Sequence, residues 1–281
     1  MHVTSPDYPL ASNAAYTPSL HSLDHAMKFE KTIGVPNIVL VQPSIYGNDN
    51  SCLLDALKEI GPIHGRGVVG FDPDNIDSKT LQQWHEMGVR GVRINLKSTN
   101  AQFTQESLRN TLQQYAKVLK PFNWVVELFI GMESMPQLLR IVPDLGVKVC
   151  IAHFGAPNLK ETSHPYDPFK VPGFEALAQL LRDHKVWVKF SGAYRFDSDD
   201  QFRGIEPMAK ELLGSVGDRI VFASDWPHTR FEGLDVKPFV MKCLDWTEEY
   251  GVKDAVFRDN TKDLWNNELE FSCWIFRIMY R

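Results

Sequence analysis

The sequence predicts an α/β protein of the (β/α)8 TIM barrel class, in which the first strand is truncated. Three observations favour this class. Seven short apolar segments rich in β-branched residues alternate with amphipathic segments over 281 residues, a length that suits one barrel. Polar side chains occur at the carboxyl end of almost every apolar segment. The composition shows no break that would indicate a second domain.

The expected strands are nearly continuous in apolar character, which is typical of strands that are buried on both faces. They cover residues 37–42, 66–71, 90–95, 124–129, 148–153, 186–191 and 220–225. Amphipathic patterns around them predict helices over residues 22–32, 51–60, 78–87, 104–119, 132–143, 173–184, 201–213 and 236–250. This alternation predicts parallel βαβ units.

Parallel βαβ units can form either an open, doubly wound sheet or a closed barrel. No glycine-rich phosphate loop follows the first strands, which weakens the dinucleotide-binding version of the open sheet. Seven strands are one fewer than a barrel needs, and the segment HVT at residues 2–4 could supply the truncated first strand. We therefore predict a single barrel domain over residues 1–265, followed by an atypical, largely apolar tail over residues 266–281.

The overall composition excludes several classes of partner. The formal net charge is −5 and no basic stripe is present, which argues against nucleic acid. No apolar run reaches the roughly 18 residues that cross a bilayer, and the N-terminus does not look like a secretory signal. The four cysteines form no CxxC pair, so we expect a reducing, cytoplasmic location. The expected partner is a small anionic substrate, and a homo-oligomer is possible.

The sequence VFASDWPHT, residues 221–229, places an aspartate directly after an apolar strand. A buried carboxylate is costly unless something pairs with it. Asp225 could cap a helix, but Pro227 and a loop follow, so a role in a site is favoured. At a barrel mouth such a carboxylate can accept a proton from water or bind a metal. His153 ends another apolar strand and is either a catalytic partner or a hydrogen-bonded rim residue, while His228 is expected at the surface.

An arginine interrupts the strand over residues 90–95. Arg93 is open to two interpretations, an ion pair with Glu127 on the next strand or a bidentate contact with a substrate carboxylate. Lys189 and Ser191 share one face of their strand, because side chains alternate with a period of two. Loop residues that could add contacts to a ligand are Tyr194, Arg195, Ser44 and Tyr46.

Six motifs follow one another in an order found in amidohydrolase-related proteins. They are MHVTSPDYPL, QPSIYGNDN, GVRINL, AHFGAP, KFSGAYR and ASDWPHT. With these motifs the chain resembles the 2-pyrone-4,6-dicarboxylate lactonase branch of the amidohydrolase superfamily, from about His2 to Trp265. The resemblance implies a distorted (β/α)8 barrel that hydrolyses a small carboxylated lactone or a related ester.

The resemblance also implies a role for individual residues. Asp225 matches an aspartate that activates water, and His153 matches a histidine that helps to polarise the carbonyl group. Arg93 and Arg195 match arginines that hold substrate carboxylates. His2 matches the second histidine of a His-x-His pair, whose first histidine is absent here, and we expect it to help His153 polarise the carbonyl.

We expect the enzyme to work without a metal cofactor. Two ions are not expected, because residue 127 is glutamate rather than the histidine of two-metal members and no lysine bridges the ions. One zinc ion held by His2, His153 and Asp225 is the alternative, which would make the protein a zinc-dependent decarboxylase of the same superfamily. His2 is expected to be loosely held near the chain end, which lowers metal affinity. A further alternative is a non-catalytic barrel that binds a metabolite or a partner.

Overall fold

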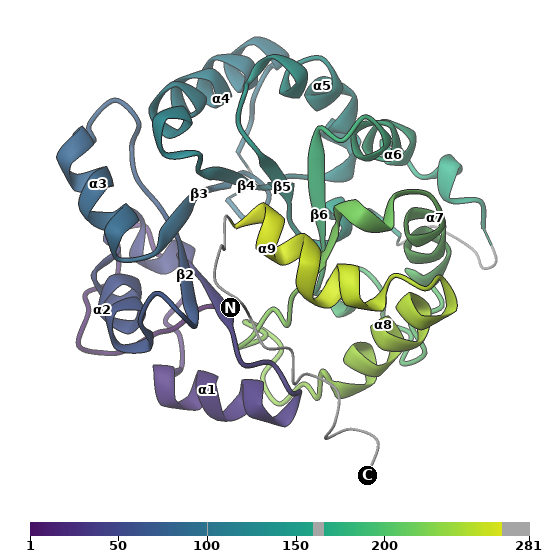
Figure 1. Ribbon diagram of the computed structural model, residues 1–281, viewed down its shortest axis with the longest axis horizontal. Coiled ribbons are helices and arrows are strands. Elements are labelled where there is room, and N and C mark those ends of the chain that lie inside the picture. Colours follow the sequence, from purple (N-terminus) through teal and green to yellow (C-terminus); the bar gives the residue numbers. More distant parts are fainter. Residues whose placement is uncertain (100, 160–165, 266–281) are drawn as a thin grey trace.

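The computed structural model describes residues 1–99, 101–159 and 166–265 of the chain. Within them, seven parallel strands form one curled sheet in sequential order, with helices around it (Figure 1). The strands are β1 (Ile38–Val41), β2 (Gly65–Val69), β3 (Val89–Asn95), β4 (Val125–Phe129), β5 (Val149–Ile151), β6 (Val186–Phe190) and β7 (Ile220–Phe222). The predicted barrel class is confirmed, and each predicted strand is present.

Helices connect successive strands, as the alternating pattern predicted. They are α1 (Leu23–Thr32), α2 (Ser51–Ile60), α3 (Ser78–Glu86), α4 (Gln105–Leu119), α5 (Met135–Leu139), α6 (Phe174–Arg182), α7 (Glu206–Val216), α8 (Lys237–Glu249) and α9 (Asn260–Leu264). No helix in the described part of the chain is long and apolar enough to span a membrane.

Two of the predicted helices need correction. α5 fills only the middle of the predicted range 132–143, and Pro143 lies in a separate short turn after it. Proline lacks a backbone donor and therefore interrupts the helical ladder. The helix predicted over residues 201–213 begins only at Glu206, because Phe202 has a φ of 57° that an α-helix excludes. α9 has no counterpart among the predicted helices. The tail predicted over residues 266–281 lies outside the described residues.

The first residues of the chain occupy the position of the truncated strand. The Met1 nitrogen donates to the Val39 carbonyl at 3.0 Å, and the Val41 amide donates to the Met1 carbonyl at 2.8 Å. On the other side, the His2 amide donates to the Trp226 carbonyl at 2.9 Å. Residues 1–2 thus lie between β1 and the segment after β7, and the expectation that His2 is loosely held is wrong.

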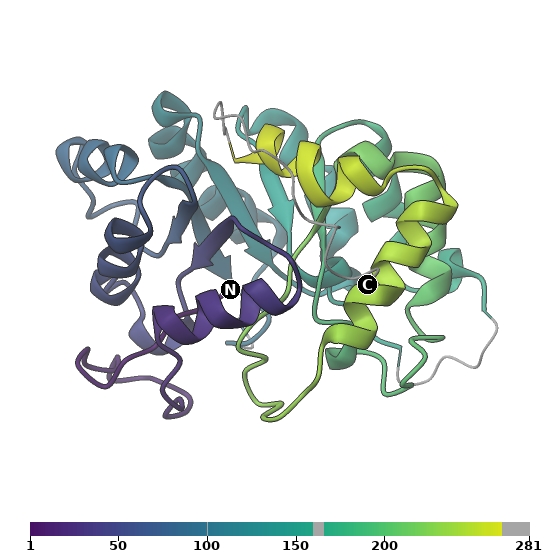
Figure 2. The same ribbon diagram turned by 60° about the horizontal axis from the view of Figure 1, so that its bottom comes forward.

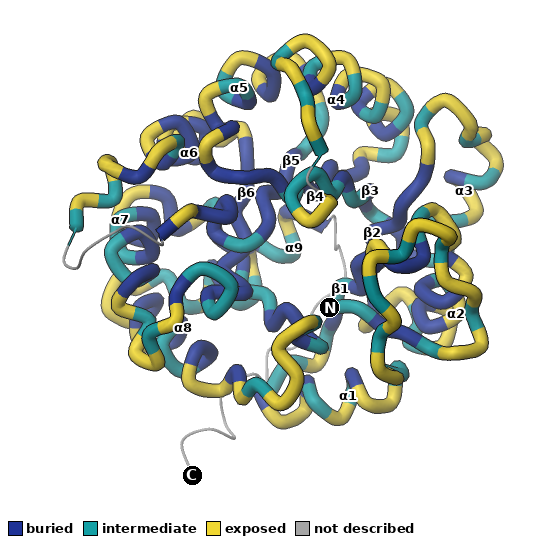
Figure 3. The backbone as a smooth tube through the Cα atoms, turned by 180° about the vertical axis from the view of Figure 1, so that it is seen from behind, coloured by how far each residue is buried: buried dark blue, intermediate teal, exposed yellow. Residues whose placement is uncertain are grey.

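The barrel interior is apolar at one end. Side chains from six of the strands meet the end of α9 there in one buried cluster. Its members are Val41, Val68, Val125, Cys150, Trp187, Val221, Leu264 and Trp265. Figure 2 shows α9 at this end and the loops that precede α1 and α8 at the other. A second, larger core lies between the strands and the inner faces of the helices, which are the buried parts of the tube in Figure 3.

The interior becomes polar toward the carboxyl ends of the strands. On β4, Val125 and Glu127 point the same way because strand side chains alternate with a period of two. On β6 and its extension, Trp187, Lys189 and Ser191 share the interior face in the same manner. β4 and β6 thus contribute apolar residues to the closed end and polar residues further along, and these polar residues line a chamber under the loops.

Candidate active site

A pocket opens at the end of the barrel where the strands finish. Its lining includes His2, Ser44, Arg93, His153, Arg195 and Asp225, all of them predicted site residues. A narrower continuation runs inward and adds Glu127, Lys189 and Ser191 to the lining. Tyr194 contacts Asp225 from the side. Tyr46 is placed elsewhere, where its hydroxyl group exchanges hydrogen bonds of 3.0 Å with the backbone of Ser5.

Asp225 is the anchor of the pocket. Its carboxylate is buried, and its Oδ2 accepts hydrogen bonds from the Tyr194 hydroxyl at 2.6 Å and from Arg195 Nε at 2.8 Å. Burial alone would raise the pKa of this carboxyl group, but His153, Arg195 and Tyr194 together hold the pKa well below its usual value. Asp225 is therefore ionised at neutral pH, and its Oδ1 is turned away from these two donors.

His153 faces that second oxygen. Its Nε2 lies 3.7 Å from Asp225 Oδ1, and its Nδ1 lies 2.8 Å from the Ser191 hydroxyl. Burial lowers the pKa of His153 to about 4 against the opposing effect of Asp225, and the nearby cations Arg195, Lys189 and Arg93 add to the lowering. The imidazole is thus neutral at pH 7, and Ser191 fixes the direction of its ring.

A glycine allows these two groups to come together. Gly192 directly follows Ser191 and has a φ of +61°, which favours glycine. A Cβ atom there would lie 2.8 Å from Asp225 Oδ2 and 3.0 Å from His153 Nδ1. His153 and Asp225 themselves have φ values of 52° and 58°. Such left-handed conformations are costly in other residues and often mark functional sites.

His2 contributes an acceptor to the pocket. Its Nδ1 lies 2.7 Å from the Val41 carbonyl oxygen, so this nitrogen must carry the proton. Burial and the neighbouring Arg93 lower the pKa of His2 well below its usual value. The neutral ring therefore presents the lone pair of Nε2 toward the chamber.

Arg93 does not form the ion pair with Glu127 that was one of its two interpretations. Arg93 Nη1 donates to the Gln42 carbonyl at 2.6 Å. Glu127 pairs instead with Lys189, two strands away, inside the barrel. The guanidinium group of Arg93 therefore remains directed at the pocket that it lines.

Residues 1–266 match the model of the amidohydrolase family. The chain belongs to the amidohydrolase family. This amidohydrolase is 28% identical over 242 residues to the 4-sulfomuconolactone hydrolase of Hydrogenophaga intermedia, covering 84% of this chain and 75% of the relative. It is 27% identical over 239 residues to the 2-pyrone-4,6-dicarboxylate hydrolase of Comamonas testosteroni, covering 81% of this chain and 75% of the relative.

Solved structures agree with this placement. A candidate 2-pyrone-4,6-dicarboxylic acid hydrolase from Pseudomonas putida superposes on the amidohydrolase with a TM-score of 0.76 at 29% identity, over 96% of both chains. A protein from Agrobacterium tumefaciens superposes with a TM-score of 0.80 at 18% identity, over 94% of this chain and 93% of the other. At that identity the second likeness concerns the fold alone.

Several residues that line the chamber of the amidohydrolase were not predicted as site residues. Ser191, Lys189 and Glu127 lie in it, and the period-two pattern of β6 had placed the first two on one face. Arg230 also lines the pocket, and its guanidinium group lies 5.3 Å from the ring centre of Tyr16. Arg230 and Tyr16 lie in loops, where the spacing of residues in the sequence does not show which way a side chain points.

His228 is not at the surface, as the sequence suggested. It is only 6% exposed, and its ring packs edge-on against Phe29 and Tyr194. A turn that joins the Asp225 carbonyl to the His228 amide at 2.9 Å directs the ring inward. The ring of His228 thus packs between Phe29 and Tyr194.

The charges of the pocket disfavour a zinc ion. Among residues 1–99, 101–159 and 166–265, no three histidine, cysteine, aspartate or glutamate side chains are grouped as ligands. One oxygen of the Asp225 carboxylate is already paired with Arg195. A divalent cation would also face the guanidinium groups of Arg93 and Arg195, which repel it.

Proposed function

We propose that this amidohydrolase hydrolyses a small carboxylated lactone without a resident metal ion. The observation that carries the proposal is the pairing of ionised Asp225 with neutral His153 across 3.7 Å in a chamber that also holds Arg93. The two relatives named above are lactone hydrolases, and their names support this reaction class. The role proposed for each residue follows from its hydrogen bonds.

Asp225 is the proposed general base. Its Oδ2 is occupied by Tyr194 and Arg195, so Oδ1 is the oxygen that takes a proton from the attacking water molecule. The distance from Oδ1 to His153 Nε2 exceeds a hydrogen bond. The two groups can therefore contact the same reacting centre rather than each other.

His153 is the proposed donor to the carbonyl oxygen. When the Ser191 hydroxyl donates to Nδ1, the proton of the neutral ring is on Nε2 and points into the chamber. A hydrogen bond from this nitrogen stabilises the negative charge that develops on the carbonyl oxygen during attack. Because the pKa of His153 is about 4, the ring is neutral at pH 7. It donates this hydrogen bond as a neutral imidazole and does not first have to be protonated.

His2 takes a different part from the one expected from the sequence. A neutral ring with its proton on Nδ1 has an acceptor at Nε2 and cannot polarise a carbonyl group. We propose that His2 instead accepts a hydrogen bond from the attacking water molecule and orients it toward the lactone.

Positive charge at the mouth selects the substrate. Arg93, Arg195 and Arg230 line the pocket, and Asp225 neutralises part of this charge. Guanidinium groups match the geometry of carboxylates and bind them in bidentate fashion. A lactone that carries a carboxylate is thus favoured over a neutral ester.

A panel of carboxylated and neutral lactones, assayed with and without a chelator, tests the proposal. We expect turnover of carboxylated lactones that the chelator leaves largely intact, and well under one equivalent of zinc by elemental analysis. Lactone turnover that the chelator abolishes, together with stoichiometric zinc, would show that the hydrolysis needs a metal ion. Stoichiometric zinc without lactone turnover would favour the zinc-dependent decarboxylase. Ligand binding without turnover would favour the non-catalytic barrel.

Arg93→Lys should weaken the binding of carboxylated ligands. One charge-assisted hydrogen bond contributes about 1.5–3 kcal/mol, which is roughly a 10- to 100-fold rise in Kd when the bidentate contact is lost. A neutral analogue should bind unchanged, as calorimetry with both ligands can show. Arg90→Lys is the matched control on the same strand, because Arg90 donates to the His85 and Val89 carbonyls outside the pocket. Equal loss for both ligands would contradict this role.

Location and assembly are further proposals of this kind. Cys52, Cys150 and Cys243 are buried free thiols, which supports a reducing, cytoplasmic setting. A homo-oligomer stays a prediction.

A further inference from the structure

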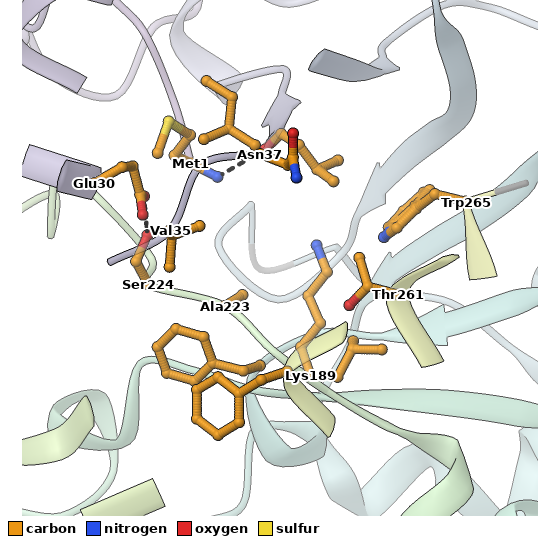
Figure 4. Close-up of a pocket in the computed structure, with 14 residues that line it drawn as sticks. Met1, Glu30, Val35, Asn37, Lys189, Ala223, Ser224, Thr261 and Trp265 are labelled. Atoms are coloured by element: carbon orange, nitrogen blue, oxygen red, sulfur yellow. Dashed lines mark hydrogen bonds between the residues drawn. The ribbon is translucent and has the colours of Figure 1, made fainter. Parts of the chain in front are cut away.

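A buried acid on the first helix contacts the segment that carries Asp225. Glu30 of α1 is 2% exposed, and its Oε1 accepts a hydrogen bond from the Ser224 hydroxyl at 2.9 Å (Figure 4). The two residues are 194 positions apart in the chain. Ser224 is the residue directly before Asp225, so α1 has a direct contact with the base segment.

The same hydroxyl group also reaches the residue after Asp225. The Trp226 amide donates to Ser224 Oγ at 3.4 Å, while the Trp226 carbonyl accepts from the His2 amide at 2.9 Å. Ser224 can accept from Trp226 because it donates its own proton to Glu30. Both sides of Asp225 are therefore held, one by the chain of contacts from Glu30 and the other by the N-terminal segment.

Burying the Glu30 side chain at this position costs folding free energy. The side chain lines a pocket with apolar residues such as Val35 and Phe222 and with Met1, and its Oε2 has no hydrogen-bond partner among the described residues. Burial raises the pKa of Glu30 to about 7, and the hydrogen bond from Ser224 and the nearby N-terminal amine offset the rise only in part. A buried, half-satisfied acid destabilises a fold relative to an apolar side chain of the same shape.

We propose that Glu30 is a positioning residue that acts on the Asp225 base through Ser224. Asp225 has a φ of 58°, a strained conformation that persists only where its neighbours hold it. Without an acceptor at Glu30, the Ser224 hydroxyl is free to turn, the Trp226 amide loses its partner and the carboxylate of Asp225 shifts. The inference rests on the proposed function, because it assigns Asp225 the role of base.

Two variants separate positioning from a structural role. Glu30→Met keeps the length of the side chain and removes the acceptor, whereas Glu30→Gln keeps an acceptor for Ser224. We expect Glu30→Met to match or exceed the wild-type Tm, because it removes a buried acid, yet to lower kcat about 10- to 100-fold with KM nearly unchanged. Glu30→Gln should retain most of the wild-type kcat.

A third variant tests whether Glu30 acts on Asp225 through Ser224. Ser224→Ala should lower kcat by a similar factor, and combining it with Glu30→Met should add little, because both remove the same contact. Wild-type kcat in Glu30→Met would overturn the proposal. A fall in kcat that is explained by a fall in Tm would also overturn it. Equal falls in kcat in Glu30→Met and Glu30→Gln would do the same.

The proposal can also be judged if the wild-type protein hydrolyses no lactone. In that case the proposed function fails, and the amide signals of Asp225 and Trp226 in ¹H–¹⁵N spectra become the readout. Both should shift in Glu30→Met and stay close to wild type in Glu30→Gln. Unchanged signals in Glu30→Met would refute the positioning role independently of turnover.

Discussion

Asp225→Asn should reduce lactone turnover by about 10²–10⁴-fold, the usual contribution of a general base. Asparagine keeps the shape of the side chain and one oxygen that can accept from Tyr194 and Arg195, so the pocket should stay assembled. It has no basic oxygen to take a proton from water. We therefore expect kcat to collapse while the affinity for a carboxylated inhibitor, measured by calorimetry, changes little.

Asp197→Asn is the matched control for this experiment. Asp197 is also buried, but its carboxylate accepts from the backbone amides of Asp199 and Ile205 outside the pocket. Its replacement should affect stability and leave kcat close to wild type. Wild-type turnover in Asp225→Asn would show that another group acts as the base.

Lys189→Met should destabilise the protein by about 3–5 kcal/mol at neutral pH, the usual cost of leaving one partner of a buried ion pair alone. The Lys189 and Glu127 side chains are only 9% and 5% exposed. Burial opposes the ionised form of Glu127, but Lys189 and the nearby Arg93 hold its pKa below the usual value. Without Lys189 the folded state must bury a carboxylate that has lost its hydrogen-bonded partner and keeps only the more distant Arg93. Chemical denaturation can measure the loss of stability.

The pH dependence of this loss identifies its cause. In wild type the lowered pKa of Glu127 gives a contribution to stability that is present above the unfolded pKa and is lost as the pH falls. In Lys189→Met the folded pKa should instead be raised, so the deficit should grow as the pH rises from about 4 to 7. The double variant Glu127→Gln/Lys189→Met should recover most of the stability at pH 7.

Lys28→Met serves as the surface control, because Lys28 and Asp24 form an ion pair whose side chains are 70% and 68% exposed. Solvent screens such a pair, so its loss should leave stability nearly unchanged. An equally small effect of Lys189→Met would mean that the chamber does not depend on its buried pair.

Local pattern predicted the parallel βαβ units, because short apolar segments rich in β-branched residues are typical of buried strands. The absence of a glycine-rich phosphate loop and the family resemblance then favoured the barrel over an open sheet. The positions of Arg93, His153 and Asp225 at strand ends were likewise readable, since carboxyl ends of parallel strands meet on one face. Residues 2–4 were offered as a possible truncated first strand, and the structure places Met1 and His2 beside β1.

The sequence by itself thus determined the fold and the ring of groups at the barrel mouth, because both depend on the repeating geometry of strands. Only the tertiary structure decided which groups pair. Arg93 and Glu127 are register partners on adjacent strands, yet Lys189 reaches Glu127 from β6 because long side chains cross the barrel interior. The contact of Glu30 with Ser224 joins residues 194 positions apart, and no local pattern encodes such a distance. Partner choice depends on side-chain direction and burial, which are fixed only when the sheet has curled into a barrel.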